Sequence, residues 1–183
     1  MNMRSLLAWS LIAVSLSTVA AEAAARHHAR AQKWSAWRLS FSETGRDGAP
    51  EVYAENLARQ PVPGPSDWGA VKQVTAFCRD HKAGFEIKTD GGAWGYSFWG
   101  PAYGVTYQVD GATPMNASWR GSDTGDAAVF PGDALDFLQA LPDDGLIAFR
   151  VSDSFGREHD AAFRLRGIAA VRSLIARACW RKI

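Results

Sequence analysis

The stretch that decides the fold is GVTYQVDG, from Gly104 to Gly111. Val105, Tyr107 and Val109 alternate with polar residues, which is typical of a β-strand that buries one face. The pair Asp110-Gly111 follows directly, and Asp-Gly beside an alternating apolar run is a strong signal for a tight hairpin turn. This stretch therefore predicts a strand that reverses into an antiparallel neighbour.

The same alternation recurs along the chain, in residues 34–42, 72–79, 85–89, 146–153 and 159–165. Residues 114–120 and 127–130 add two shorter strand-like runs, whereas residues 51–58 are compatible with a strand or a short helix. A short helix is expected at 132–141, before Pro142, and an apolar stripe predicts a C-terminal helix at 168–180. We therefore predict a mainly β fold, a β-sandwich or two-sheet antiparallel domain, with the short helix and the C-terminal helix packed on it.

The composition excludes several classes of protein. The 183 residues are 47% hydrophobic and 21% charged, with a net charge of +1, which is ordinary for one globular domain. Near-neutral charge leaves no electrostatic footprint for nucleic acid, so none is expected as a partner. Two cysteines are too few for a Cys-only zinc site or an iron–sulfur cluster, and no cofactor is predicted.

The N-terminus has the order of a secretory signal peptide. Arg4 precedes an apolar run over residues 6–20, and Ala21-Glu22-Ala23 matches an Ala-x-Ala cleavage site. The run is shorter than the roughly 20 residues of a membrane span, although an uncleaved anchor is the alternative. We expect a signal peptide at 1–23, a flexible basic tail at 24–33 and a single β-rich domain at 34–183, without stable membrane insertion after cleavage.

Export changes what the two cysteines imply. In an oxidising compartment two thiols usually pair, which predicts a disulfide between Cys78 and Cys179. Such a bond would link an early strand to the C-terminal helix. Two free, buried cysteines are the alternative.

The sequence contains no motif that identifies a reaction. A phosphate-binding loop, a Gly-x-Ser-x-Gly elbow and a His-Glu-x-x-His motif are all absent, so no catalytic and no metal-binding residue is predicted. His81 and His159 lie in or beside predicted turns, and we interpret both as solvated side chains. Carboxylates occur in clusters for which turns and surface positions are the simplest roles: Asp123 with Asp126, Asp133 with Asp136, and Asp143 with Asp144.

The most unusual segment is GGAWGYSFWGPAYG, residues 91–104, in which aromatic residues are interleaved with glycines. If these aromatic rings are exposed, they can stack on sugar rings or on a protein partner. The alternative is that this face belongs to the core and that the glycines permit bends. The candidate binding surface consists of Trp94, Tyr96, Trp99 and Tyr103.

The order of features resembles a known group of exported bacterial proteins. The features are Cys78 at the end of an early strand, VTYQVDG at 105–111, Trp119, and AFRLRG at 162–167 leading into the helix with Cys179. Over residues 71–180 this is similar to the VasI/TagO-like periplasmic proteins associated with type VI secretion and, more loosely, to the invasion-associated locus B family. The chain departs from the pattern at Gln108, where an arginine is expected. The resemblance implies an exported, non-enzymatic accessory protein and supplies no catalytic residues.

The leading hypothesis is therefore an accessory or binding protein of the bacterial envelope without catalytic activity, periplasmic or alternatively secreted. Its expected partner is a protein or the cell wall. One alternative is an envelope hydrolase that acts on peptidoglycan or another glycan, with an acid pair as its catalytic groups. Another is a secreted inhibitor or immunity-type protein that presents a loop on a disulfide-tied scaffold.

Overall fold

The structure is a computed structural model, which describes residues 33–34, 36–42, 50–58, 71–89, 102–153 and 155–180. The chain divides into two units, Met1–Arg30 and Ala31–Ile183, and all described residues belong to the second unit. The expected signal peptide and nearly all of the expected basic tail lie outside the described residues, so both stay predictions.

The described residues form strands and two helices, which follow one another along the chain as β1 (Lys33–Trp34), β2 (Trp37–Ser42), β3 (Glu51–Leu57), β4 (Val71–Arg79), β5 (Lys82–Thr89), β6 (Ala102–Val109), β7 (Met115–Gly121), β8 (Ala127–Val129), α2 (Ala134–Ala140), β9 (Leu146–Ser152), β10 (Glu158–Arg164) and α3 (Ile168–Trp180). Residues 51–57 of the segment that was ambiguous in the sequence, 51–58, are therefore a strand.

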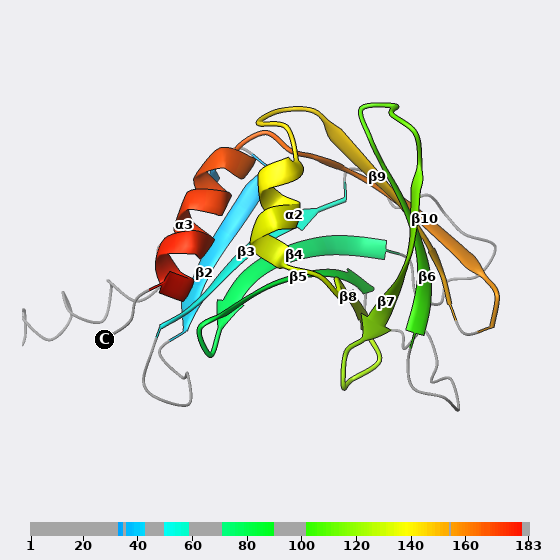
Figure 1. Ribbon diagram of the computed structural model, residues 1–183, viewed down its shortest axis with the longest axis horizontal. Coiled ribbons are helices and arrows are strands. Elements are labelled where there is room, and N and C mark those ends of the chain that lie inside the picture. Colours follow the sequence, from blue (N-terminus) through cyan, green and yellow to red (C-terminus); the bar gives the residue numbers. More distant parts are fainter. Residues whose placement is uncertain are drawn as a thin grey trace, which may run out of the picture. The chain divides into compact units, whose positions relative to one another are not determined.

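All the described strands belong to one antiparallel sheet, in the order β1-β2-β3-β4-β5-β8-β7-β6-β9-β10. The sheet is strongly curved, and β2–β5 lie opposite β6, β9 and β10, with both helices on the inner side (Figure 1). The mainly β fold with a short helix and a packed C-terminal helix is confirmed. Its two halves are joined through β8 into one continuous sheet.

An aromatic cluster fills the space between the two halves of the sheet. Trp119 of β7 is fully buried, and its ring centroid lies 5.3–6.4 Å from those of five other rings: Phe85, Tyr107, Phe130, Phe137 and Phe149. These rings come from both halves and from α2, so the cluster fixes how far the sheet curls. Tilted and edge-to-face pairs at such distances are the favourable arrangements for aromatic rings.

The turn expected at Asp110-Gly111 is present, and Asp110 also forms hydrogen bonds to the first residue of β9. Asp110 and Gly111 both have positive φ, at 47° and 75°, which a tight turn between β6 and β7 requires. The Oδ1 atom of Asp110 accepts a hydrogen bond from the N–H of Leu146 at 2.7 Å, and its own N–H donates to the carbonyl of Leu146 at 2.9 Å. This turn therefore aligns β9 beside β6.

A disulfide joins Cys78 of β4 to Cys179 of α3, as the sequence predicts. The helix packs on β3, β4 and β5, and its buried residues Ile168, Val171 and Ile175 complete the core. A disulfide of this kind fits an extracellular or periplasmic protein, because reducing compartments keep cysteine thiols in the reduced form. Neither of the described helices is long and apolar enough to cross a membrane.

Candidate functional site

The outer surface of β7, β6, β9 and β10 carries two rows of small and polar residues. Strand alternation turns the buried residues Tyr103 and Val105 inward and leaves their neighbours exposed or half-buried on the outside. Strand register places one residue of each strand side by side in each row. We call these residues the polar sheet face; they are Asn116, Thr106, Arg150 and Asp160 in the first row and Ser118, Gly104, Ser152 and Glu158 in the second.

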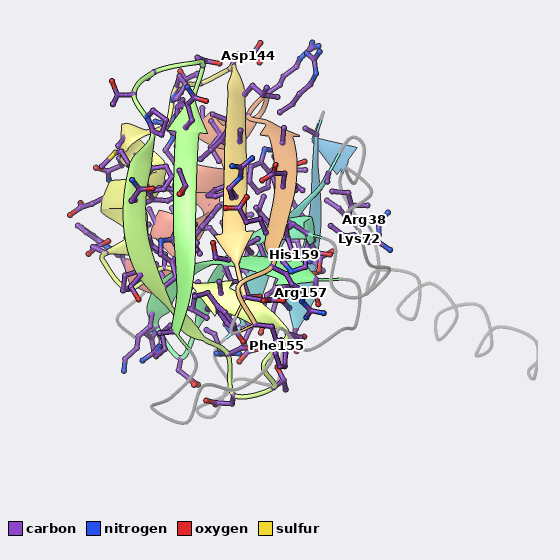
Figure 2. The ribbon with its side chains drawn as sticks, turned by 90° about the vertical axis from the view of Figure 1, so that its right-hand side faces the viewer. Arg38, Lys72, Asp144, Phe155, Arg157 and His159 are labelled. Carbon is purple, nitrogen blue, oxygen red and sulfur yellow. A yellow bond between two sulfur atoms is a disulfide. The ribbon has the colours of Figure 1, made fainter. Side chains whose placement is uncertain are left out.

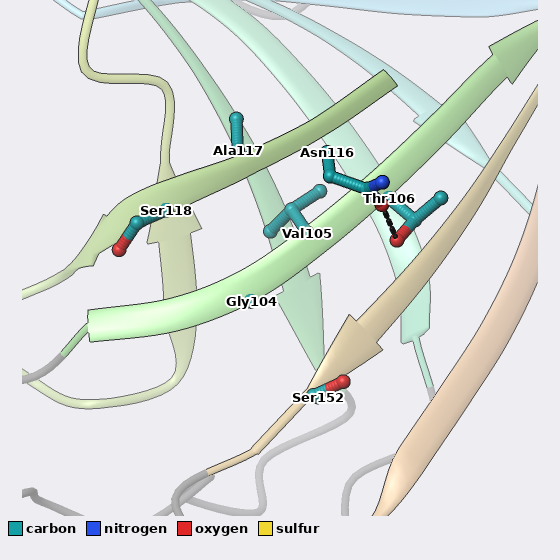
Figure 3. A pocket seen from close by; sticks show the side chains of 7 residues that line it. All are labelled: Gly104, Val105, Thr106, Asn116, Ala117, Ser118 and Ser152. Carbon is teal, nitrogen blue, oxygen red and sulfur yellow. Dashed lines mark hydrogen bonds between the residues drawn. The ribbon is translucent and has the colours of Figure 1, made fainter. Parts of the chain in front are cut away.

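A shallow hollow of about 370 Å³ lies in this face, with Gly104 at its centre (Figure 3). The Thr106 hydroxyl donates a hydrogen bond of 2.6 Å to Oδ1 of Asn116, which leaves the Asn116 amide N–H groups available. The hydroxyls of Ser118 and Ser152 have no hydrogen-bond partner among the described residues. The hollow thus offers hydrogen-bond donors and acceptors, and none of the side chains that line it is charged.

Nothing among the described residues requires glycine at position 104. Glycine inside a strand weakens it and usually marks a bulge, a bend, or a place where a ligand or another backbone comes close. The register of β6 against β7 runs past Gly104 without a shift, the pairing of β6 with β9 begins at Gly104, and the φ of Gly104 lies outside the left-handed region. A Cβ atom built there would approach Cβ of Ser152 to 3.6 Å, an ordinary van der Waals contact. Among the described residues neither a bulge against β7 nor a left-handed backbone accounts for Gly104, and close approach by a ligand or by another backbone is among the usual reasons that are left.

Charged residues flank the hollow on one side and neutralise one another. Arg150 binds both carboxylate oxygens of Asp160 at 2.8 Å and lies 3.4 Å from Glu158. The hydrogen bonds from Arg150 hold the pKa of Asp160 below its ordinary value, and the same pair raises the pKa of Arg150. These side chains are about half exposed, so the network contributes little to stability. It does give this end of the face a fixed arrangement.

The turn between β9 and β10 is organised by the buried carboxylate of Asp153. Its Oδ1 atom accepts the backbone N–H groups of Phe155 and Arg157, both at 2.9 Å. Its Oδ2 atom accepts Nε of Arg157 at 2.6 Å and lies 3.1 Å from Nε2 of His159. Burial acts to raise the pKa of Asp153, but these hydrogen bonds outweigh it and lower the pKa. Figure 2 shows Phe155, Arg157 and His159 at this end of the two strands.

The placement of His159 corrects the expectation from sequence. We interpreted this histidine as a solvated turn residue, but it lies in β10 and is buried, beside the equally buried Asp153. The cause is the alternation of β10, which turns His159, Ala161 and Phe163 inward together. His81 does lie in a turn, between β4 and β5, with φ of 58°.

The candidate surface predicted from the aromatic segment is divided by the structure. Trp94, Tyr96 and Trp99 lie outside the described residues, so their exposure stays a prediction. Tyr103 is fully buried, and its hydroxyl donates a weak hydrogen bond of 3.3 Å to the carbonyl of Gly125. The assignment of Tyr103 to an exposed surface was wrong, because its position in β6 turns the ring toward the core.

The carboxylate clusters are engaged in local structure. Asp133 caps α2 by accepting the N–H groups of Leu135 and Asp136 at 2.8 and 3.1 Å. Asp126 accepts hydrogen bonds from Ser122 and Thr124, and Asp143 forms an ion pair with Arg172 of α3. No group of three or more His, Cys, Asp or Glu side chains is placed to hold a metal ion in the part of the chain that the structure describes. No observation in these residues favours the hydrolase alternative.

Comparisons with protein-family models, curated proteins and solved structures give no significant match to this chain. The site therefore rests on the geometry of the chain itself. Sequence reasoning included Gly104 in the glycine-rich segment, which it interpreted either as an exposed binding surface or as a core face whose glycines permit bends. The unshifted register between β6 and β7 at Gly104, which excludes a bulge there, becomes visible once the strands are paired.

Proposed function

We propose that the protein is an exported accessory protein of the bacterial envelope that binds a partner through the polar sheet face and does not catalyse a reaction. The observation that supports this most strongly is Gly104. A residue that weakens a central strand, in a hollow lined by hydrogen-bonding groups, is best explained by a ligand that must come close to the backbone.

Three further features support the proposal. The expected signal peptide predicts export, and the disulfide is of the kind found in oxidising compartments. The resemblance to the VasI/TagO-like periplasmic proteins points to an accessory role, and it stays a prediction. On these grounds we place the protein in the periplasm, with secretion as the alternative.

The proposal is tested by filling the hollow without disturbing the fold. Gly104→Thr adds a hydroxyl and a methyl group to the hollow, and threonine is favoured in strands. Ala162→Thr is the matched control, because Ala162 is a half-buried residue of β10 on the same outer surface but outside the hollow. The assay measures how much purified protein an isolated envelope fraction of the producing cells binds at increasing protein concentration.

We expect Gly104→Thr to raise the half-saturation concentration by about tenfold or more, because the added atoms occupy the space that the partner needs. Ala162→Thr should bind like the wild type. Equal binding by all three proteins, with unchanged melting temperatures, would show that the hollow is not the binding site.

A further inference from the structure

The described residues of the turn between β9 and β10 are held by several hydrogen bonds to Asp153. A buried carboxylate is costly unless its oxygens are hydrogen-bonded, and Asp153 meets this condition with two backbone and two side-chain partners. Two backbone hydrogen bonds add to it: the N–H of Asp153 donates to the carbonyl of Arg157 at 2.9 Å, and that of Gly156 to the carbonyl of Asp153 at 3.0 Å. The backbone of Phe155, Gly156 and Arg157 is therefore held in place by Asp153.

The turn presents the aromatic ring of Phe155 to the solvent. Phe155 is 70% exposed, although its own N–H is tied to Asp153. The guanidinium carbon of Arg157 lies 4.9 Å from the centre of the Phe155 ring, so a cation lies over one face of the ring. Among the protein's described residues, the Nη groups of Arg157 have no hydrogen-bond partner. The turn thus fixes an aromatic and a cationic group side by side at the surface.

The turn adjoins the hollow directly. Ser152, the last residue of β9, lies beside Gly104, and Glu158, the first residue of β10, lies beside Ser152. A partner seated in the hollow is therefore close to Phe155 and Arg157. Aromatic residues and arginine are the side chains enriched at protein–protein interfaces, where a few anchors in desolvated pockets supply most of the affinity.

We infer that Phe155 and Arg157 form the anchor for a protein partner that has an apolar pocket edged by carboxylates. This inference rests on the proposed function, because it names the partner class for the same surface. The phenyl ring fits an apolar pocket, and the Nη groups of Arg157, which have no partner among the described residues, fit a carboxylate. The hydrogen bonds that hold Phe155 and Arg157 to Asp153 before a partner arrives also reduce the entropy lost on binding. A neutral glycan can stack on the phenyl ring, but its hydroxyl groups offer no carboxylate to Arg157.

The test uses the same envelope-binding assay with the full exported protein. Phe155→Ala should raise the half-saturation concentration by tenfold or more, as truncation of an interface anchor does. The matched control is Phe41→Ala, because Phe41 is also an exposed phenylalanine, at 57%, but lies in β2, in the other half of the sheet. Phe41→Ala should leave binding unchanged.

Charge and partner class are tested in two further arms. Arg157→Glu should weaken binding more than Arg157→Gln does, since a glutamate repels the expected carboxylates. Digesting the envelope fraction with protease should abolish binding, whereas muramidase digestion should not. A lowered melting temperature identifies any Arg157 variant that has lost the structure of the turn. In that case the test is decided by Phe155→Ala, because Phe155 is exposed.

The outcomes separate the two proposals. Binding that depends on Gly104 but not on Phe155, or that muramidase removes and protease spares, would leave the proposed function standing and overturn the protein-partner inference. Binding that depends on Phe155 but not on Gly104 would support the anchor and refute the hollow as the binding site. Binding that depends on neither residue would overturn both.

Discussion

Breaking the disulfide between Cys78 and Cys179 should leave the domain folded but much less stable. The bond closes a loop of 101 positions and attaches α3, whose residues Ile168, Val171 and Ile175 are fully buried, to β4. For a loop of this length the chain-entropy model gives about 4.7 kcal/mol, through the freedom that the unfolded chain regains. In a domain of this size that corresponds to a fall in melting temperature of about 9 to 19 °C.

Two perturbations separate the cross-link from its packing. Cys78→Ala combined with Cys179→Ala removes the bond and both sulfur atoms, whereas reduction of the wild type removes the bond alone. Calorimetry of both samples beside the oxidised protein measures the two contributions. If reduced and oxidised wild type melt within about 3 °C of each other, the cross-link does not restrict the unfolded chain as the loop-closure model requires.

Two other predictions concern single residues. Gly84→Ala should lower the free energy of unfolding by about 1 to 3 kcal/mol, because a Cβ atom there would overlap the Phe77 ring that lies on Gly84. Urea denaturation measures this loss, and an unchanged midpoint would contradict the packing of Phe77 on Gly84. Asp153→Asn should lower the free energy of unfolding by about 2 to 3 kcal/mol at pH 7, because the charge-assisted hydrogen bonds of the Asp153 carboxylate are lost. Since folding lowers the pKa of Asp153 from 3.8, the stabilisation is present above pH 3.8 and is lost as pH falls through the lower folded value. The difference between wild type and Asp153→Asn should therefore shrink in acid, and a difference that grows would refute this assignment.

The strands and the C-terminal helix could be predicted because their signals are local. Alternation in GVTYQVDG and in residues 146–153 reflects one buried and one exposed face, and the Asp110-Gly111 turn depends on the positive φ of two adjacent residues. The order of the strands could not be predicted, because the pairs β5–β8 and β6–β9 join segments that are distant in sequence. That order decides which residues share the polar sheet face.

The errors at individual residues arise from which face of a strand each residue was assigned to. Tyr103 and Gly104 are adjacent, yet one is core and the other lines the hollow, since neighbouring residues of a strand point to opposite faces. Treating residues 91–104 as one surface concealed that division. His159 was misplaced because it was assigned to the turn, whereas the alternation of β10 turns it inward, beside Asp153.

The measurement that tests the central claim most directly is the unfolding free energy of Gly104→Ala against wild type, in the absence of any partner. If Gly104 serves a ligand and not the fold, alanine should stabilise the protein by about 0.5 to 1 kcal/mol, because it removes the entropic cost of glycine in a strand. A loss of stability would mean that the fold itself requires glycine at this position, and the argument for a binding hollow would lose its support.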